Sequence, residues 1–196
     1  MKIRQVVIHG KGRVSLDDAE LSDELSQGEI LVETEATFIS AGTELSGYQG
    51  LNPGLPKPGP PDYPLRPGYL NVGRVASVGE NVDEFRTGDR IFSFARHASH
   101  HRFAVNTGDG VVVCVPEDIH SHVAAASWMA GIAITSLQAS EVSLNDWVAV
   151  FGLGVVGNLA AQLFQLSGAR VIGIDPVPFR RRLAQEVGIE HTVGGS

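Results

Sequence analysis

The chain has 196 residues, with 15 Lys and Arg against 22 Asp and Glu, so its formal net charge is −7. This acidic balance argues against nucleic acid as a partner, because phosphate backbones repel negative charge. The single cysteine, Cys114, cannot form an internal disulfide or a four-cysteine zinc site. No stretch reaches the roughly 18 uninterrupted apolar residues of a membrane helix, and the N-terminus has the pattern of a strand rather than a signal peptide. We expect a cytoplasmic protein without a membrane partner.

The first part of the chain, up to about Pro116, carries short β-like runs separated by glycine and proline. Short runs with frequent turn signals predict a compact β-barrel or sandwich. The expected strands cover residues 1–8, 30–36, 72–78, 90–94 and 111–115. The proline-rich stretch between Gly50 and Pro67 cannot be a central strand or a helix interior. We expect a loop there that either flanks a cleft or is simply solvated.

After Pro116 the apolar pattern changes its period. Helices are expected at residues 122–129 and 134–140, with Gly131 between them, and a buried strand at 147–151. A helix at 158–166, a strand at 171–174 and a helix at 178–187 complete a β-α-β-α order, the start of a doubly wound parallel sheet. The predicted fold class is therefore α/β plus β: a β-barrel domain at residues 1–120 and an incomplete Rossmann domain at residues 121–196.

The most informative motif is Gly152-Leu153-Gly154-Val155-Val156-Gly157, between a strand and a helix. In a dinucleotide-binding turn the first glycine allows the bend and the second admits a pyrophosphate to the backbone N–H groups. The third lets helix and strand pack closely. The helix N-terminus adds about half a positive charge beneath the anion. The alternative is a glycine-rich turn without a ligand, because 23 of the 196 residues are glycine.

Asp175 lies 18 residues after Gly157, at the end of the next expected strand. A carboxylate at that place accepts hydrogen bonds from the adenosine ribose hydroxyls, which favours the dinucleotide interpretation. It also repels a 2′-phosphate, so NAD is the expected cofactor. Arg180, in the run Arg180-Arg181-Arg182, is able to accept such a phosphate, which keeps NADP open. The other interpretation of this run is a solvated helix face.

A β-rich half followed by a strand, a glycine turn and a helix resembles the medium-chain dehydrogenase/reductase superfamily, the zinc alcohol dehydrogenase-like oxidoreductases. Residues 75–82 and Gly88-Asp89-Arg90-Ile91 are similar to its V-x-x-V-G-x-x-V…G-D-R-V passage, and residues 148–157 to its dinucleotide fingerprint. The resemblance implies a GroES-like catalytic domain before the Rossmann domain. It also implies hydride transfer between a nicotinamide and a small alcohol or carbonyl substrate.

The chain departs from the zinc-dependent members of that superfamily. Those members hold the catalytic metal with a Cys in C-G-S/T-D, a His in G-H-E and usually a third ligand before the cofactor domain. The matching positions here are Ala41, Tyr69 and approximately Gly131, and none of these side chains is a plausible zinc ligand. The structural zinc lobe is missing too, because Cys114 is the only cysteine. We expect no metal; a zinc enzyme with relocated ligands is a distant alternative.

Hydroxyl groups near these positions are the candidate catalytic residues. Thr43 matches the family's Ser/Thr that relays the substrate proton, and Tyr69 or Thr43 can orient a carbonyl oxygen while hydride arrives. Ser40 and Glu44 are polar neighbours, and the alternative for Ser40 and Thr43 is that they satisfy backbone groups of a turn. Thr135 matches the threonine that lies against the nicotinamide, or is a helix residue bonded to its own backbone.

Five of the seven histidines fall within 26 positions, a cluster made of His97, His100, His101, His120 and His122. The segment from His97 to His101 is either a polar loop or part of the cleft lining. Two imidazoles without a third ligand make a weak metal site. If one of them is functional, a general acid is the more plausible role.

The chain ends about where the third strand of the sheet begins, whereas a complete dinucleotide domain has about six strands. One hypothesis is a zinc-independent NAD(P)-dependent oxidoreductase, represented by its substrate domain and half of its cofactor domain. The other is a non-catalytic binding or assembly module. An open sheet edge favours a homo-oligomer. The identity of the substrate is not written in the sequence.

Overall fold

The computed structural model describes residues 1–51, 61–105 and 110–195, which fold into two units. The first unit is Met1–Ala126 and the second is Ser127–Ser196. The expected fold class is confirmed, because antiparallel sheets make up the first unit and a parallel sheet covered by helices makes up the second.

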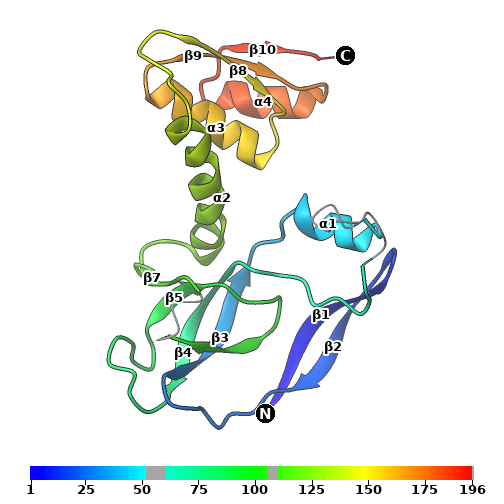
Figure 1. The fold of residues 1–196 in the computed structure, drawn as a ribbon, viewed down its shortest axis with the longest axis vertical. Coiled ribbons are helices and arrows are strands. Elements are labelled where there is room, and N and C mark those ends of the chain that lie inside the picture. Colours follow the sequence, from blue (N-terminus) through cyan, green and yellow to red (C-terminus); the bar gives the residue numbers. More distant parts are fainter. Residues whose placement is uncertain (52–60, 106–109, 196) are drawn as a thin grey trace. The chain divides into compact units, whose positions relative to one another are not determined.

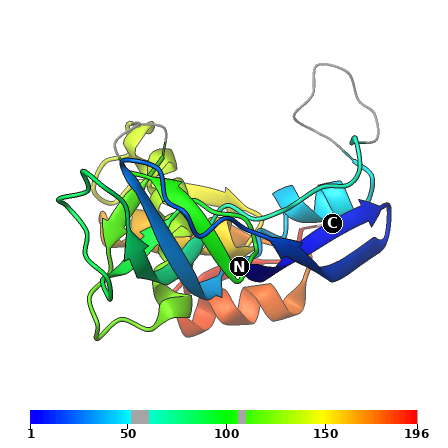
Figure 2. The ribbon, with the colours of Figure 1, turned by 90° about the horizontal axis from the view of Figure 1, so that it is seen from below.

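The first unit contains a hairpin and a five-stranded sheet (Figure 1). The hairpin pairs β1 (Lys2–Gly10) with β2 (Arg13–Glu20), and the helix α1 (Thr43–Tyr48) lies along it (Figure 2). The sheet has the order β6-β3-β4-β5-β7 with antiparallel pairing throughout. Its strands are β3 (Glu29–Thr37), β4 (Asn71–Val78), β5 (Arg90–Ser93), β6 (His100–Ala104) and β7 (Val112–Cys114).

Alternate apolar side chains of this sheet form the core of the first unit. Ile30 and Val32, two residues apart on β3, point to the same face and pack with Val75, Phe85 and Ile91. All five are at least nine-tenths buried. Burying side chains of this size stabilises the fold by about 1.5–3 kcal/mol each.

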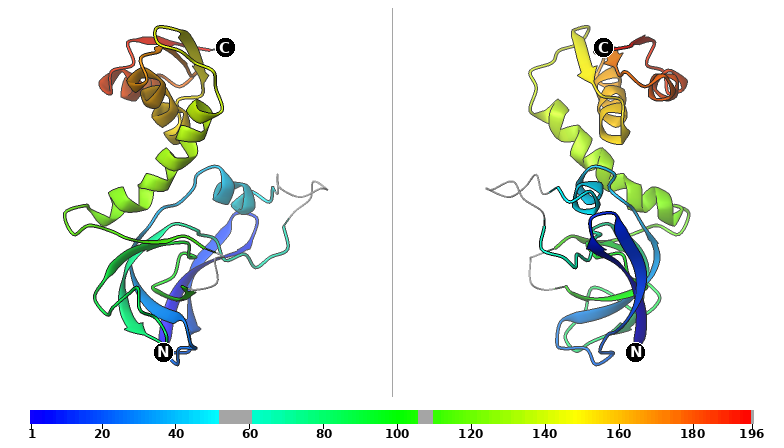
Figure 3. Two further views of the ribbon diagram at one scale, coloured as in Figure 1. Left: turned by 60° about the vertical axis from the view of Figure 1, so that its left-hand side comes forward. Right: turned by 90° about the vertical axis from the view of Figure 1, so that its right-hand side faces the viewer.

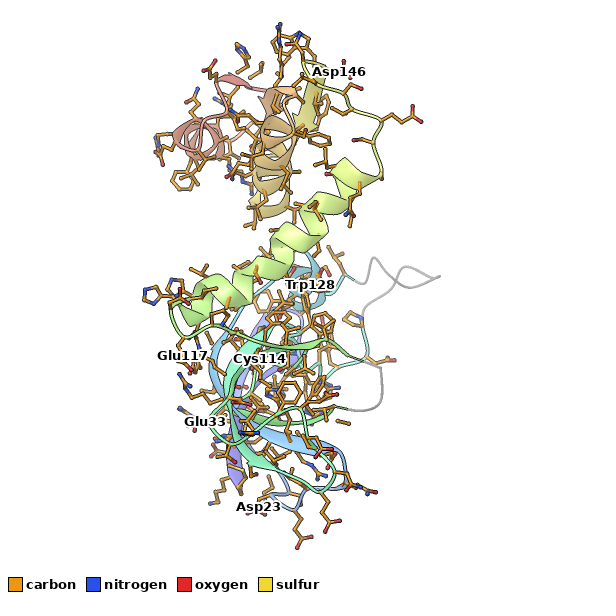
Figure 4. The ribbon with its side chains drawn as sticks, turned by 90° about the vertical axis from the view of Figure 1, so that its left-hand side faces the viewer. Asp23, Glu33, Cys114, Glu117, Trp128 and Asp146 are labelled. Atoms are coloured by element: carbon orange, nitrogen blue, oxygen red, sulfur yellow. The ribbon has the colours of Figure 1, made fainter. Side chains whose placement is uncertain are left out.

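A buried arginine ties this sheet to the start of helix α2 (Ser121–Gln138). Arg90 donates hydrogen bonds to Glu35 at 2.9 Å, to the Ser121 hydroxyl at 2.8 Å and to the Ile119 carbonyl at 2.6 Å. Burial alone would raise the pKa of Glu35, but hydrogen bonds from Ser121 and Arg90 and nearby arginine charges outweigh it and lower that pKa. Glu117, labelled in Figure 4 between β7 and α2, extends the network through Arg74.

The second unit is a three-stranded parallel sheet with the order β10-β9-β8. Its elements are β8 (Trp147–Phe151), α3 (Val155–Leu166), β9 (Arg170–Ile174), α4 (Pro178–Glu186) and β10 (His191–Val193). Figure 1 shows α3 and α4 on the same side of the sheet. Leu153, Phe164 and Ile189 are buried between these helices and the sheet.

Several expectations about the elements were wrong. The two expected helices around Gly131 are one continuous helix, α2 (Figure 3). A helical glycine costs only about 1 kcal/mol relative to alanine, and the alanines of the same helix, four before Gly131 and one after it, favour the helix. Helix α3 begins at Val155, three residues earlier than expected. The sequence pattern also missed β2, α1 and β6.

The loop expected at His97 to His101 is confirmed only in part, because His97 lies in a bend before strand β6. His100 and His101 belong to strand β6, where His101 pairs with Val32 of β3. The proline-rich stretch lies partly outside the described residues, and its described end, Pro64 to Pro67, lines a pocket. Among the described residues, no helix combines the length and apolarity needed to cross a membrane.

His101 makes the stability of the first unit depend on pH. Burial, followed by the charge of His100, lowers the pKa of His101 from 6.5 to about 4, and its Nε2 atom lies 3.0 Å from the Ser93 hydroxyl. The unfolded chain therefore takes up this proton first, and stability falls as the pH drops from about 6.5 toward 4. The expected loss is about 3 kcal/mol. Urea unfolding across this pH range should show a shallower loss for His101→Gln, and an unchanged slope would contradict the assignment.

Candidate functional site

The glycine turn between β8 and α3 is built as a tight bend that its own backbone holds in place. Gly152 has φ +87°, a conformation that side chains rarely adopt, and its N–H donates to the Ile174 carbonyl at 2.8 Å. At Gly157 an added Cβ would lie 1.8 Å from the Gly152 carbonyl oxygen. The protein fold itself therefore requires glycine at both of these positions.

Gly154 is different, because no residue that the structure describes requires glycine there. Its backbone at φ −67° and ψ −173° is open to any residue, and an added Cβ would meet no atom within 4 Å. It is the residue that precedes the first turn of α3, where unsatisfied backbone N–H groups and the helix dipole attract anions. Val155 and Val156 expose their side chains beside it, while Leu153 is buried. The turn thus leaves open space next to unsatisfied donors.

Asp175, at the end of β9, is bonded directly to this turn. It is 1% exposed, and its carboxylate accepts hydrogen bonds from the Leu153 N–H and the Val177 N–H, both at 2.7 Å. Arg180 approaches the same carboxylate at 3.4 Å. The hydrogen bond from Val177 is the main cause that lowers the pKa of Asp175, and those from Leu153 and Arg180 outweigh the opposing effect of burial. The structure therefore brings Asp175, Arg180 and the glycine motif together.

Thr135 lies apart from that group, on α2. Its hydroxyl donates to the Ile132 carbonyl one turn earlier, at 2.6 Å. This bond is the local arrangement that a helical threonine commonly adopts.

The first unit contains a pocket of about 450 Å³. The beginning of α1, the segment before β4 and one residue of β1 form its walls. The lining residues are Ile8, Thr43, Glu44, Gly47, Pro64, Leu65, Arg66, Pro67, Gly68, Tyr69 and Arg96.

Backbone contacts hold the pocket walls together. Ile8 and Leu65 exchange two backbone hydrogen bonds of 2.9 Å, and the His97 N–H donates to the Pro67 carbonyl at 2.9 Å. Gly68 has φ +108°, and a Cβ there would lie 2.3 Å from the His97 nitrogen. Only glycine therefore permits the segment that carries Tyr69 to pass so close to His97.

Two of the three expected catalytic residues, Thr43 and Tyr69, line this pocket although they are 26 positions apart. Among the described residues, neither side-chain hydroxyl has a hydrogen-bond partner, so both can bind a ligand. Ser40 precedes α1, and its backbone N–H donates to Glu44 at 2.7 Å. Ser40 thereby helps to orient Glu44, which the sequence marked only as a polar neighbour.

The positions that match zinc ligands in the superfamily lie on different elements. Ala41 precedes α1, Tyr69 lines the pocket, and Gly131 lies within α2. Within residues 1–51, 61–105 and 110–195, no three His, Cys, Asp or Glu side chains are grouped so that they could hold a metal ion.

The sequence pattern missed a pair of buried ionisable side chains behind the pocket. Glu44 and His97 are 53 residues apart in the chain, and Glu44 Oε2 lies 2.6 Å from His97 Nε2. The clustering of histidines was a signal for His97, but nothing local in the sequence pointed to its carboxylate partner. The contact depends on the long-range crossing of Gly68 and His97 described above.

Comparison with known proteins agrees with this architecture. The alcohol dehydrogenase GroES-like domain matches residues 26–124, just over half of the chain. An alcohol dehydrogenase from Geobacillus stearothermophilus is 26% identical over 197 aligned positions, covering 86% of this chain and 57% of that enzyme. The chain therefore spans little more than half the length of this relative.

Solved structures have the same fold. An alcohol dehydrogenase of Escherichia coli CFT073 complexed with NADH superposes with a TM-score of 0.82 at 20% identity, over 100% of this chain and 63% of that one. A dehydrogenase of Sinorhizobium meliloti 1021 bound to NADP gives a TM-score of 0.79 at 23% identity. The superposition covers 99% of this chain and 62% of that one. The chain belongs to the alcohol dehydrogenase GroES-like family, within the medium-chain dehydrogenase/reductase superfamily.

Proposed function

We propose that this chain supplies the substrate domain, residues 1–120, and the first part of the dinucleotide-binding domain, residues 121–196, of an NAD(P)-dependent oxidoreductase. The reaction is hydride transfer between a nicotinamide and a small alcohol or carbonyl compound, without a catalytic zinc. The observation that carries the proposal is the open space at Gly154, which the protein leaves beside the first turn of α3. Glycine at that position, between two glycines that shape the turn, would let a ligand come close to the backbone.

The residues of the second unit fit a dinucleotide. Backbone N–H groups of Gly154, Val155 and Val156 would hold the pyrophosphate, at a helix N-terminus that favours negative charge. The N–H of Leu153 already donates to Asp175, so Leu153 would shape the turn by holding that carboxylate. Gly152 and Gly157 keep the turn in shape. When bound, the nicotinamide supplies the hydride acceptor or donor of the reaction.

NAD is the favoured cofactor, because the ionised Asp175 would repel a 2′-phosphate. An ionised carboxylate offers about four acceptor positions. Leu153, Val177 and Arg180 use three of them, and because the side chain of Asp175 is 1% exposed, a ribose hydroxyl would reach the fourth when the half-exposed Arg180 moves aside. The contact with Asp175 also engages Arg180, the residue that would have to accept the phosphate of NADP. The exposed Thr135 is the candidate contact with the nicotinamide.

The pocket of the first unit is the proposed substrate site. Apolar side chains such as Ile8 and Leu65 line it together with the hydroxyls of Thr43 and Tyr69. These hydroxyls would form hydrogen bonds with the hydroxyl or carbonyl oxygen of the substrate. Ser40 would support the start of α1. The side chains at positions 41, 69 and 131 support a reaction that does not depend on a zinc ion at the usual site.

We extend the proposal to a homo-oligomer in the cytoplasm. An acidic chain with one exposed cysteine suits a reducing compartment. Soluble oligomers are mostly assemblies of identical chains.

Turnover tests the proposal with the protein expressed from its complete reading frame. We expect NAD⁺-dependent oxidation of small alcohols, followed at 340 nm. Thr43→Val and Tyr69→Phe should each lower kcat by about tenfold to a hundredfold, because each removes a hydroxyl near the reacting oxygen. Thr87→Val, at an exposed position outside the pocket lining, is the matched control. Full activity of both hydroxyl variants would exclude these residues, and absence of turnover together with absence of cofactor binding would favour a non-catalytic module.

A further inference from the structure

Glu44, in the wall of the pocket, is paired with the buried His97. The side chain of Glu44 is 9% exposed and that of His97 is 5% exposed. Glu44 lines the pocket, whereas His97 does not. Glu44 is therefore the member of the pair that borders the pocket.

Contacts from several elements fix the Glu44 carboxylate and the backbone that carries His97. The second carboxylate oxygen of Glu44, Oε1, accepts the Ser40 N–H at 2.7 Å. The backbone of His97 donates to the Pro67 carbonyl and accepts the Val6 N–H, at 2.9 and 2.8 Å. An ionisable pair held this firmly keeps its geometry when a proton is added or removed.

The buried Nδ1 atom of His97 has no hydrogen-bond partner among the residues that the structure describes. A bare nitrogen acceptor is less costly to bury than an unpaired N–H or a charged imidazolium. The neutral imidazole with its proton on Nε2, donating to an ionised Glu44, is therefore the resting arrangement. One further proton can then be taken up by Glu44.

We propose that Glu44, held by His97, exchanges the hydroxyl proton of the substrate in this pocket. The inference rests on the proposed oxidoreductase function. In alcohol oxidation the C–H bond breaks and its electron pair leaves with the hydride to the nicotinamide. The O–H bond breaks, its proton joins the Glu44 carboxylate, and the C=O bond forms. Carbonyl reduction reverses these steps. Glu44 is the catalytic residue, and His97 is a positioning residue.

The other groups of the pocket are poor substitutes for this role. The hydroxyls of Thr43 and Tyr69 are too weakly acidic to exist as bases near neutral pH. Arg66 and Arg96 stay charged over the whole working range, so they do not exchange protons. The Glu44 carboxylate is therefore the group of the pocket lining that can take the proton.

The test uses Glu44→Gln in the protein expressed from its complete reading frame. Glutamine keeps an acceptor for the Ser40 N–H and occupies the same space. We expect unchanged NADH affinity, a fall in kcat of about 100-fold or more, and loss of the acid limb of the pH profile. His97→Gln should lower kcat by about tenfold and shift that limb. Glu24→Gln, an exposed glutamate outside the pocket, is the control and should match the parent protein.

The outcomes separate this inference from the function on which it rests. If Glu44→Gln binds the cofactor and turns over with an intact acid limb, the role of Glu44 is overturned and the proposed function is not. Failure of the parent protein to bind cofactor or turn over would overturn the proposed function. If Glu44→Gln does not fold, the ¹⁵N shifts of His97 in the parent protein decide the question. Shifts that change over the same pH range as the acid limb of kcat support the proposed role of Glu44 and His97. Shifts that stay constant over that range overturn this role.

Discussion

Gly154→Val should abolish tight NADH binding while leaving the fold intact. The backbone at this position is extended, with φ −67° and ψ −173°, so a β-branched residue fits it. An added Cβ meets no protein atom within 4 Å, and we expect a change in stability below about 1 kcal/mol. The valine side chain would occupy the space through which a pyrophosphate approaches the N–H groups of the turn. Losing charge-assisted hydrogen bonds there should weaken NADH binding by about 100-fold, close to 3 kcal/mol.

Calorimetric titration of NADH, with thermal unfolding of the same samples, measures both parts of this expectation. Gly154→Ala should weaken binding less than valine, because only one methyl group enters the space. Unchanged NADH affinity in Gly154→Val would mean that no phosphate approaches this turn. A large loss of stability would mean that the position is required by the fold rather than by a ligand.

Gly157→Ala should affect stability, which Gly154→Val leaves nearly unchanged: it should destabilise the second unit. The new Cβ would lie 1.8 Å from the Gly152 carbonyl oxygen, a backbone atom that cannot rotate away. Relief of this overlap requires α3 to move away from the turn, and with it the contacts of Leu153 and Phe164 in the core. We expect a loss of about 3 kcal/mol in the free energy of unfolding.

Urea unfolding followed by circular dichroism tests this prediction. Gly154→Ala is the matched control, since it makes the same chemical change three residues earlier without a contact. Equal stability of the two variants would contradict the packing described here. Weak NADH binding by Gly157→Ala would follow from the displaced helix and would not by itself locate the ligand.

The second unit could be predicted closely from sequence because its signals are local. The strand at residues 147–151 coincides with β8, and the expected helix at 178–187 differs from α4 by one residue. An apolar run followed by glycines and then by a 3.6-residue period specifies strand, turn and helix without reference to distant residues. Gly131 misled this reasoning because a glycine inside a long alanine-rich helix is tolerated.

The candidate site of the first unit was only partly predictable. The family pattern singled out Thr43 and Tyr69, and the structure places both in the wall of one pocket. The pairing of Glu44 with His97 was not foreseen, because it depends on a crossing of chain segments 53 residues apart. Strand β6 was missed for the same reason: its histidines are not an apolar pattern, and pairing with β3 makes it a strand.

The central claim is that this chain binds a nicotinamide dinucleotide through its glycine turn and Asp175. The most direct measurement is a titration of NADH and NADPH into the protein expressed from its complete reading frame, with Gly154→Val in parallel. The account predicts saturable NADH binding at least about tenfold tighter than NADPH binding, and its loss in Gly154→Val. Absence of binding to either dinucleotide, or equal binding by Gly154→Val, would contradict it.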